Sequence, residues 1–255
     1  MRIKKGKSIC FASAKGGVGK TINILNLAGI FEQLQKRVLV IDLDLYSGGV
    51  SVSLNKNTDK SVFNMVEDMI NNRYQDIKDY ASSYDNYIDI LAAPKDPRDA
   101  GKIDAKYLEE VIKKAELNYD VVLVDTNHAL NDISLVAMQT CDQILFLTTN
   151  DPVDLKNLKT LLAIFKDLEI NNYKVLLNNS RDPFKDYFSL YDIKHILKHN
   201  VDYTLSTGLF LKEMENHIMN GIIITLDKKF ADVMPKDYQT FLVIATDLLG
   251  DDINE

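Results

Sequence analysis

The sequence predicts an α/β protein of one domain, with a doubly wound, mostly parallel sheet and helices on both faces. Short apolar runs alternate along the chain with longer stretches in which apolar residues recur every three or four positions. A glycine-rich loop joins the first apolar run to the first such stretch, and carboxylates end two later runs. A chain of 255 residues with 46% hydrophobic content can bury one core of this kind, so the domain is expected to span residues 1–255.

Each predicted strand is an apolar run that ends at a polar or small residue. The strands are expected at residues 9–12, 37–44, 87–93, 119–125, 142–149 and 173–179. The helices are expected at residues 22–34, 61–71, 104–117, 151–168, 191–198 and 237–249. Ser61 suits the N-cap of the second helix, and Pro152 is favoured in the first turn of the fourth. Residues 45–54 are flexible at Gly48 and form a candidate switch loop.

The glycine-rich loop covers residues 13–21, between the first strand and the first helix. It fits the phosphate-binding pattern G-x-x-x-x-G-K-[ST] except at Ala14, where the first glycine is missing. Gly16, Gly17 and Gly19 allow backbone N–H groups to turn inward around an anion. The N-terminal end of the following helix adds positive potential. The loop therefore predicts a site for the phosphates of a nucleotide.

Two side chains complete the predicted phosphate site. Lys20 is placed to neutralise the β and γ phosphates, and the Thr21 hydroxyl to coordinate Mg²⁺. The alternative is a tight turn between a strand and a helix with no ligand, which would leave the glycines, the lysine and the threonine coincidental. The predicted cofactors are ATP or ADP with Mg²⁺.

Residues 15–21 resemble the deviant Walker A motif, K-G-G-x-G-K-[ST], of the ParA/MinD family of P-loop NTPases. The resemblance implies that Lys15 is the signature lysine, which in that family reaches the nucleotide of a partner subunit. It also implies that the active form is a nucleotide-sandwich homodimer. The nucleotide-binding residues expected from it are Gly16, Gly17, Val18, Gly19, Lys20, Thr21, Ile22 and Asn178. Asn178 ends a strand where the family reads the adenine edge with an asparagine, and Asn179 is a close alternative.

Three carboxylates end predicted strands. Asp42 and Asp44 lie two residues apart, so they point to the same side of an extended backbone. Asp125 ends an apolar run typical of a Walker B strand. The resemblance implies that Asp42 holds a Mg²⁺-bound water, that Asp44 orients the attacking water, and that Asp125 accepts a hydrogen bond from Thr21 or a Mg²⁺-bound water. The alternative is ordinary aspartates at strand ends.

The loop after Asp125 departs from the family, which has a proline where this chain has Asn127. Either the loop is a subfamily variant or hydrolysis is slowed. His128 is interpreted as a surface group, because hydrolysis in this family needs no histidine base. His195 and His199 are four residues apart, but no acidic or cysteine companion stands at ligand spacing, so they are interpreted as a solvated helix face.

Composition limits the remaining function classes. A net charge of −7 and a pI near 5.2 give no general attraction to nucleic acid, so nucleic acid is a disfavoured partner. The chain lacks an apolar run of about 18 residues and a signal-peptide core, which predicts a cytoplasmic protein. Cys10 and Cys141 are expected in the core, which argues against an iron–sulfur relative. Residues 250–255 are acidic, unlike the basic amphipathic helix by which MinD grips membranes, so no direct membrane anchor is expected.

The predicted function is an ATPase switch that dimerises with ATP and hydrolyses it slowly, with Lys15, Lys20 and Asp44 as the catalytic residues. Residues 45–49, which follow Asp44, are most similar to the corresponding residues of the TadZ/CpaE branch, which localises pilus-assembly machinery. The resemblance thus implies an assembly or secretion apparatus as the protein partner, with recruitment to a pole or a membrane-bound complex. Two alternatives stay open: a DNA-partition ATPase, and a localisation scaffold that binds ATP with little hydrolysis.

Overall fold

The computed structural model describes residues 5–181, 187–209, 217 and 219–250 of the chain. Among them, an eight-stranded sheet has the order β3-β4-β2-β5-β1-β6-β7-β8. Every pairing is parallel except that of β3 with β4. The strands are β1 Lys7–Ser13, β2 Val38–Leu43, β3 Ser82–Ser83, β4 Ile88–Leu91, β5 Val121–Thr126, β6 Gln143–Thr148, β7 Tyr173–Asn178 and β8 Tyr203–Leu205.

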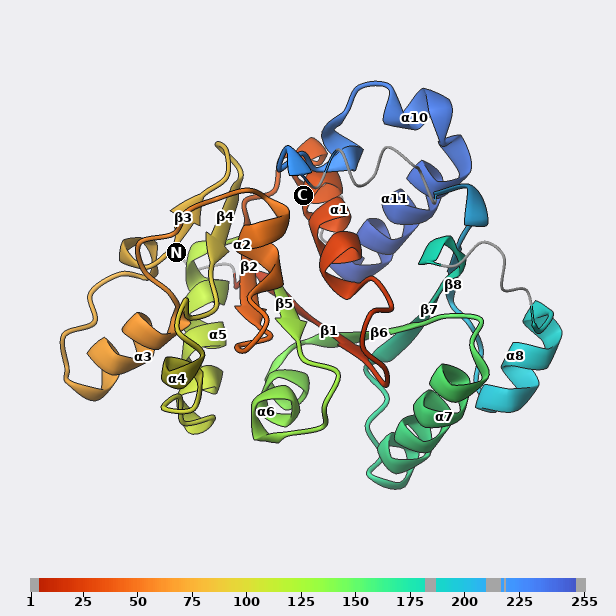
Figure 1. Cartoon of the computed structure of the whole chain (residues 1–255), viewed down its shortest axis with the longest axis horizontal. Coiled ribbons are helices and arrows are strands. Elements are labelled where there is room, and N and C mark those ends of the chain that lie inside the picture. Colours follow the sequence, from red (N-terminus) through yellow and green to blue (C-terminus); the bar gives the residue numbers. More distant parts are fainter. Residues whose placement is uncertain (1–4, 182–186, 210–216, 218, 251–255) are drawn as a thin grey trace.

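Helices cover both faces of this sheet (Figure 1). The α-helices are α1 Lys20–Gln33, α2 Gly49–Ser53, α3 Val62–Ile70, α4 Pro97–Ala100, α5 Lys106–Asn118, α6 Asp132–Thr140, α7 Pro152–Asp167, α8 Leu190–Leu197, α10 Phe230–Val233 and α11 Pro235–Leu249. Short 3₁₀ turns are η1 Ile77–Asp79, η2 Asn179–Arg181, η3 Thr207–Leu209 and η4 Ile224–Leu226. Within the described chain, no helix has the length and apolar character needed to cross a membrane.

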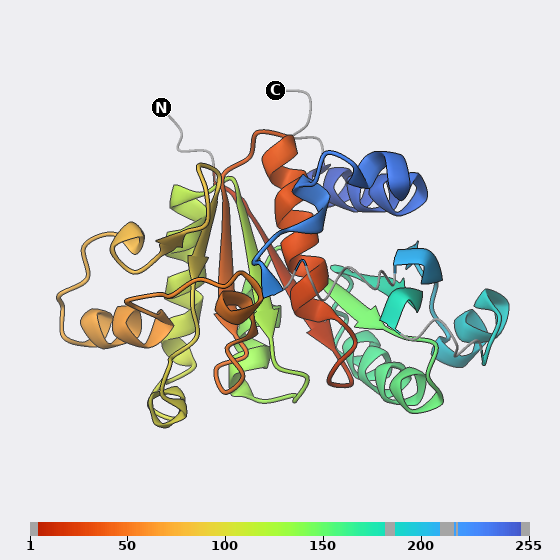
Figure 2. The same ribbon diagram turned by 45° about the horizontal axis from the view of Figure 1, so that its top comes forward.

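The buried side chains form two layers, one on each face of the sheet. Ile9 and Phe11 of β1 pack in one layer with α1, α2, α10 and α11, and Cys10 and Ala12 pack in the other with α3, α5, α6, α7 and α8. Figure 2 shows α1 on the near side of the strands and α5 behind them. This alternation follows from the period of two along a strand and confirms the predicted fold class, an α/β domain with helices on both faces. Cys10 and Cys141 are buried and free, as predicted.

The predicted strands are all present, with ends shifted by a few residues. Two short edge strands, β3 and β8, were not predicted, and neither was the nine-residue helix α6. The candidate switch loop contains α2, whose N-cap Gly48 has a φ of 61°. Residues 251–255, most of the acidic end, lie outside the described residues.

The topology brings the predicted site residues to one edge of the sheet. β1 lies between β5 and β6, and β2 pairs with β5 so that Asp42 stands directly beside Asp125. All of these strands are parallel, so the loops that follow β1, β2, β5 and β7 share one edge.

Candidate nucleotide site

The loop between β1 and α1 has the backbone of an anion cradle. Gly17 and Gly19 have φ values of 77° and 94°, a region that favours glycine. A Cβ on Gly19 would also stand 2.8 Å from the Asn178 Nδ2 atom, so glycine is required there for space as well. No side chain caps the first turn of α1, whose N–H groups are left for another acceptor.

The two polar side chains at the start of α1 bind neighbouring strands. The Lys20 ammonium is buried and donates to Ser13 Oγ at 3.0 Å. The Thr21 hydroxyl donates to Asp125 Oδ2 at 2.6 Å, which joins α1 to the end of β5. Thr21 also packs beside Gly49 of α2, where an added Cβ would lie 3.4 Å from the threonine oxygen. The loop, β5 and the candidate switch loop therefore meet at Thr21.

Asp42 and Asp125 are a buried carboxylate pair. Asp42 Oδ2 accepts from the Val50 N–H at 3.0 Å, and Asp42 Oδ1 from the Asp44 N–H at 3.1 Å. Burial, and then the charge of Asp125, raise the pKa of Asp42 well above its usual range. Burial raises the pKa of Asp125 to about 6, although the Thr21 hydrogen bond and the Lys20 charge oppose the rise. Asp125 Oδ1 is buried with no hydrogen-bond partner.

This pair fits a divalent cation brought in with a nucleotide. Two buried carboxylates whose pKa values are raised, one with an orphaned oxygen, are stabilised when a positive charge arrives. Within the described residues, no group of three His, Cys, Asp or Glu side chains could hold a metal alone. Mg²⁺ suits such a site, because it takes one or two protein carboxylates and completes its shell with phosphates and water. Thr21, Asp42 and Asp125 would hold it.

Asp44 lies just beyond β2, half-buried, and contacts the loop after β5. Its Oδ1 atom accepts a 2.7 Å hydrogen bond from the Asn127 amide. The sequence singled out Asn127 because the family has a proline at this position. Its contact with Asp44 was not predicted.

Lys15 extends from the loop toward α7. Its ammonium lies 3.2 Å from Asp151 Oδ1, and the lysine side chain is 42% exposed. Asp151 caps α7 by accepting from the Val153 and Asp154 N–H groups. The pKa of Asp151 is lowered, chiefly by the Asp154 hydrogen bond and further by Lys15. Lys15 therefore has a partner within its own chain at the N-terminus of α7.

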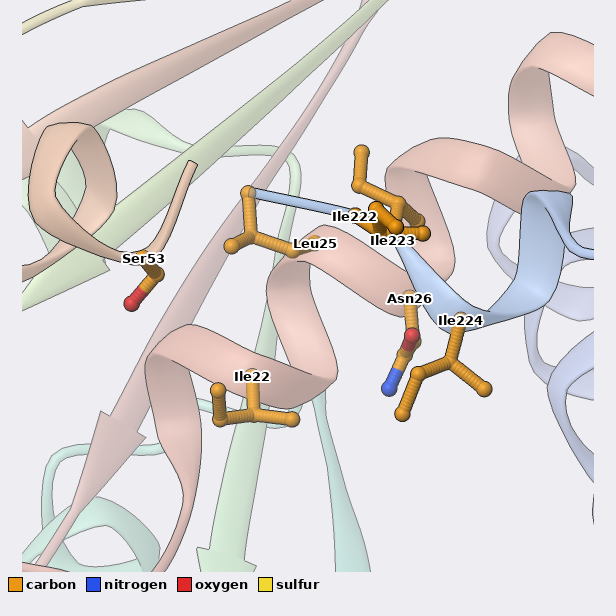
Figure 3. A pocket seen from close by; sticks show the side chains of 7 residues that line it. All are labelled: Ile22, Leu25, Asn26, Ser53, Ile222, Ile223 and Ile224. Atoms are coloured by element: carbon orange, nitrogen blue, oxygen red, sulfur yellow. The ribbon is translucent and has the colours of Figure 1, made fainter. Parts of the chain in front are cut away.

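The remaining predicted contacts lie around the loop. Asn178 is buried: its Nδ2 donates to the Val18 carbonyl at 2.9 Å, and its Oδ1 accepts from Ser180 Oγ at 2.6 Å. Asn178 thus braces the phosphate loop, and Asn179 beside it is half-buried, so the choice of adenine reader between them stays a prediction. The Ile22 side chain lines a small hollow between α1 and the segment 222–224 (Figure 3).

Of the four histidines, His128 lies near the loop, and His195 and His199 are remote from it. A Cβ on Gly16 would lie 3.3 Å from His128 Nδ1, so the exposed His128 ring stands beside the phosphate loop. His195 packs on Tyr191 and His199 on Tyr173, and His199 Nδ1 contacts the Asn200 carbonyl. The two remote histidines therefore share no site among the described residues.

Sequence reasoning missed three residues that bind the predicted ones: Ser13, Asp151 and Val50. Ser13 is the last residue of β1, and a hydroxyl at that point of a phosphate loop was the available signal. Asp151 was identified only as the start of a helix. Val50 contributes a backbone N–H, for which the side-chain sequence carries no signal.

A family model described as an AAA domain matches residues 6–178, from β1 to the end of β7. The chain belongs to this family, as a ParA/MinD-type P-loop ATPase. It is 25% identical over 166 residues to the chromosome-partitioning ATPase Soj of Thermus thermophilus, covering 64% of this chain and 63% of Soj. It is 22% identical over 197 residues to the septum site-determining protein MinD of Bacillus subtilis, covering 76% and 72%. The match to ParA of Myxococcus xanthus, 25% identical over 147 residues, covers 55% of this chain and 51% of that protein.

Solved structures share the fold over nearly the whole chain. A ParA family ATPase from Chlorobium tepidum has a TM-score of 0.79 at 19% identity, covering 95% of this chain and 98% of that one. MinD from Pyrococcus horikoshii, complexed with Mg-ADP, has a TM-score of 0.73 at 20% identity, covering 94% of each. At these identities the likeness shows the fold. The chain spans about half of the length of ParA and about two thirds of that of Soj.

Proposed function

We propose that this ParA/MinD-type chain is a switch that dimerises with ATP, hydrolyses it slowly and positions a cellular assembly. The observation that carries the proposal is the convergence of Lys20, Thr21 and the uncompensated pair Asp42 and Asp125 at one sheet edge. Such a set suits the binding of a Mg²⁺ nucleotide and little else. The names of the relatives, a chromosome-partitioning ATPase and a septum site-determining protein, support a role in positioning.

In the proposed reaction, the chain's residues bind the phosphates and orient water. The inward N–H groups of residues 16–21 bind the phosphates of ATP, and Lys20 takes up negative charge as the bond to the γ phosphate breaks. Bound Mg²⁺ would supply further charge neutralisation. Asp44 orients the attacking water. Asn178 or Asn179 contacts the adenine.

The dimer follows from Lys15. Within one chain this lysine is paired with Asp151, and its partly exposed ammonium can leave that ion pair at modest cost. We propose that ATP draws Lys15 to the phosphates bound by a second copy, so that ATP favours the dimer and hydrolysis releases it. Protein partners at a pole or a membrane-bound complex then recognise either the ATP-bound dimer or the ADP-bound monomer.

The sequence of the candidate switch loop is the basis for proposing a subfamily. Residues 45–49 favour a TadZ/CpaE-like protein that serves pilus assembly of the Tad type or a secretion apparatus. A DNA-partition ATPase is the alternative, and binding to random duplex that weakens steeply with salt would support it. A scaffold with little hydrolysis would show dimerisation by ATP without turnover.

Molar mass in solution tests the switch. The native chain, Lys15→Ala and Asp44→Ala are each measured by light scattering with Mg²⁺ and ADP, and then with Mg²⁺ and ATP. ATP is expected to double the mass of the native chain, Lys15→Ala to remain a monomer, and Asp44→Ala to persist as a dimer. If the molar mass of all three proteins is the same with ADP and with ATP, the sandwich dimer is refuted.

A further inference from the structure

The loop between β5 and α6 is fixed at both ends. At its start, the buried Thr126 hydroxyl donates to the Phe11 carbonyl of β1 at 2.7 Å. At its end, Asn131 caps α6 by accepting from the Ser134 N–H at 2.9 Å. Asn127 lies between these anchors, so its side chain extends from a backbone that is held in place.

The Asn127 side chain uses both ends of its amide. Its Oδ1 atom accepts from the Ala129 N–H at 2.8 Å, and its Nδ2 atom donates to Asp44 Oδ1 at 2.7 Å. The Ala129 N–H can only donate and an ionised carboxylate can only accept, so the amide orientation is determined by its two partners. A side chain lacking either function would lose one of these bonds.

The rest of Asp44 is also held. Its N–H donates to Asp42 Oδ1 at 3.1 Å, and its carbonyl oxygen accepts from the N–H groups of Ser47 and Gly48 at 3.0 and 2.9 Å. Asn127 is bonded to one carboxylate oxygen, Oδ1. The second, Oδ2, has no hydrogen-bond partner among the described residues. The carboxylate is therefore oriented by one neutral donor while its other oxygen is left for a ligand.

We propose that Asn127 is a positioning residue for hydrolysis, which holds Asp44 so that its second oxygen meets the attacking water. This inference rests on the proposed function, in which Asp44 orients that water. Fixing one oxygen removes rotation of the carboxylate before the reaction, and such orientation affects the rate of the chemical step more than nucleotide binding.

The test compares Asn127→Ser with Asn131→Ser. A serine at residue 127 keeps an acceptor for the Ala129 N–H but is too short to reach Asp44. The same change at residue 131 keeps an N-cap for α6 and serves as the matched control. Single-turnover hydrolysis at saturating Mg·ATP and the dissociation constant of Mg·ATP are measured for both and for the native chain. Asn127→Leu, which keeps the branched skeleton of four side-chain heavy atoms but is larger, repeats the test without any polar group.

Asn127→Ser and Asn127→Leu are expected to lower the hydrolysis rate constant by about tenfold, with the dissociation constant within about twofold of native. Asn131→Ser should match the native chain in both quantities. In an Asp44→Ala background, Asn127→Ser should leave the lifetime of the ATP dimer unchanged, because the residue it acts through is gone.

Three results would overturn the inference: an unchanged rate in both Asn127 variants, a dissociation constant that rises as far as the rate falls, or an equal loss in Asn131→Ser. A native chain that does not hydrolyse ATP would refute the proposed ATPase and this role with it. Hydrolysis by the native chain together with any of the three results would refute only the role of Asn127.

Discussion

The two edges of the sheet bury carboxylates in opposite ways. At the edge where the strands begin, Glu116 of α5 is 1% exposed, yet its charge is paired: Oε1 accepts from the Ser8 hydroxyl at 2.6 Å, and Oε2, which makes no hydrogen bond among the described residues, forms an ion pair with Lys5 Nζ at 3.0 Å. Asp142 accepts from the Ser8 N–H at 2.9 Å and lies 3.4 Å from the same ammonium. Glu116 and Asp142 are thus both paired with Lys5 within the chain.

At the edge where the strands end, Asp42 and Asp125 form no ion pair among the described residues, although Lys15 and Asp151 do. Asp42 and Asp125 stand side by side, their pKa values are raised, and the nearby Lys20 gives its hydrogen bond to Ser13. A buried carboxylate with its own cation contributes to the structure, whereas one without it favours binding of a cation from outside. The comparison of Asp42 and Asp125 with Glu116 and Asp142 thus favours the edge where the strands end as the nucleotide edge, without using the glycine-rich motif.

Asp125→Asn is the substitution with the largest expected effect on this difference between the two edges. Because the folded pKa of Asp125, about 6, lies above that of an unfolded aspartate, its contribution to stability is present below about pH 4 and is lost as pH rises through about 6. The neutral amide should therefore raise the free energy of unfolding at pH 8 by about 1–2 kcal/mol, measured in urea without nucleotide. The affinity for Mg·ADP should fall by about 100-fold, measured by calorimetry.

Asp142→Asn is the matched control at the other edge, and it should leave Mg·ADP affinity at the native value. The comparison fails if Asp125→Asn binds Mg·ADP as tightly as the native chain, or if both variants lose affinity equally.

Glu116→Gln tests the paired edge and should act in the opposite direction on stability. The amide removes the buried charge that faces the half-exposed Lys5 and weakens the bond with Ser8. The free energy of unfolding should fall by about 2 kcal/mol in urea. Glu110→Gln, on the same helix in an exposed pair with Lys114, should change it by less than about 0.5 kcal/mol. A Glu116→Gln protein as stable as the native one would mean that this edge is no better paired than the other.

Local patterns were enough to predict most of the fold and the glycine-rich loop of the candidate site. Apolar runs located the central strands, and residues 13–21 predicted a glycine-rich turn between β1 and α1, because both signals lie in neighbouring residues. β8 has three residues and α6 buries only Ser134, Ala137 and Met138, so neither carries a periodic signal that exceeds its surroundings.

The contacts that connect the site could not be predicted in the same way. The hydrogen bond of Thr21 with Asp125, 104 residues away, was expected only from the family resemblance, and that of Asn127 with Asp44, 83 residues away, was not expected at all. Each contact depends on the pairing of β2 with β5 and of β1 with β5, which sets the register of the side chains. The ion pair of Lys15 with Asp151 depends likewise on β6 lying next to β1.

Glu32 tests whether every poorly paired carboxylate belongs to the site. It lies in the last turn of α1, far from the phosphate loop at the other end of that helix, and burial followed by the neighbouring Asp85 raises its pKa to about 7. Its stabilising contribution is present below about pH 4.3 and is lost as pH rises through about 7, so Glu32→Gln should become the more stable protein above pH 7. The gain should be at most about 1 kcal/mol, because the side chain is partly solvated. Urea unfolding between pH 5 and pH 8 measures it, with the exposed Glu67→Gln as the control. Mg·ADP affinity should be unchanged, which would show that an unpaired carboxylate alone does not mark the nucleotide edge; a loss of that affinity in Glu32→Gln would contradict the placement of the site at the opposite edge.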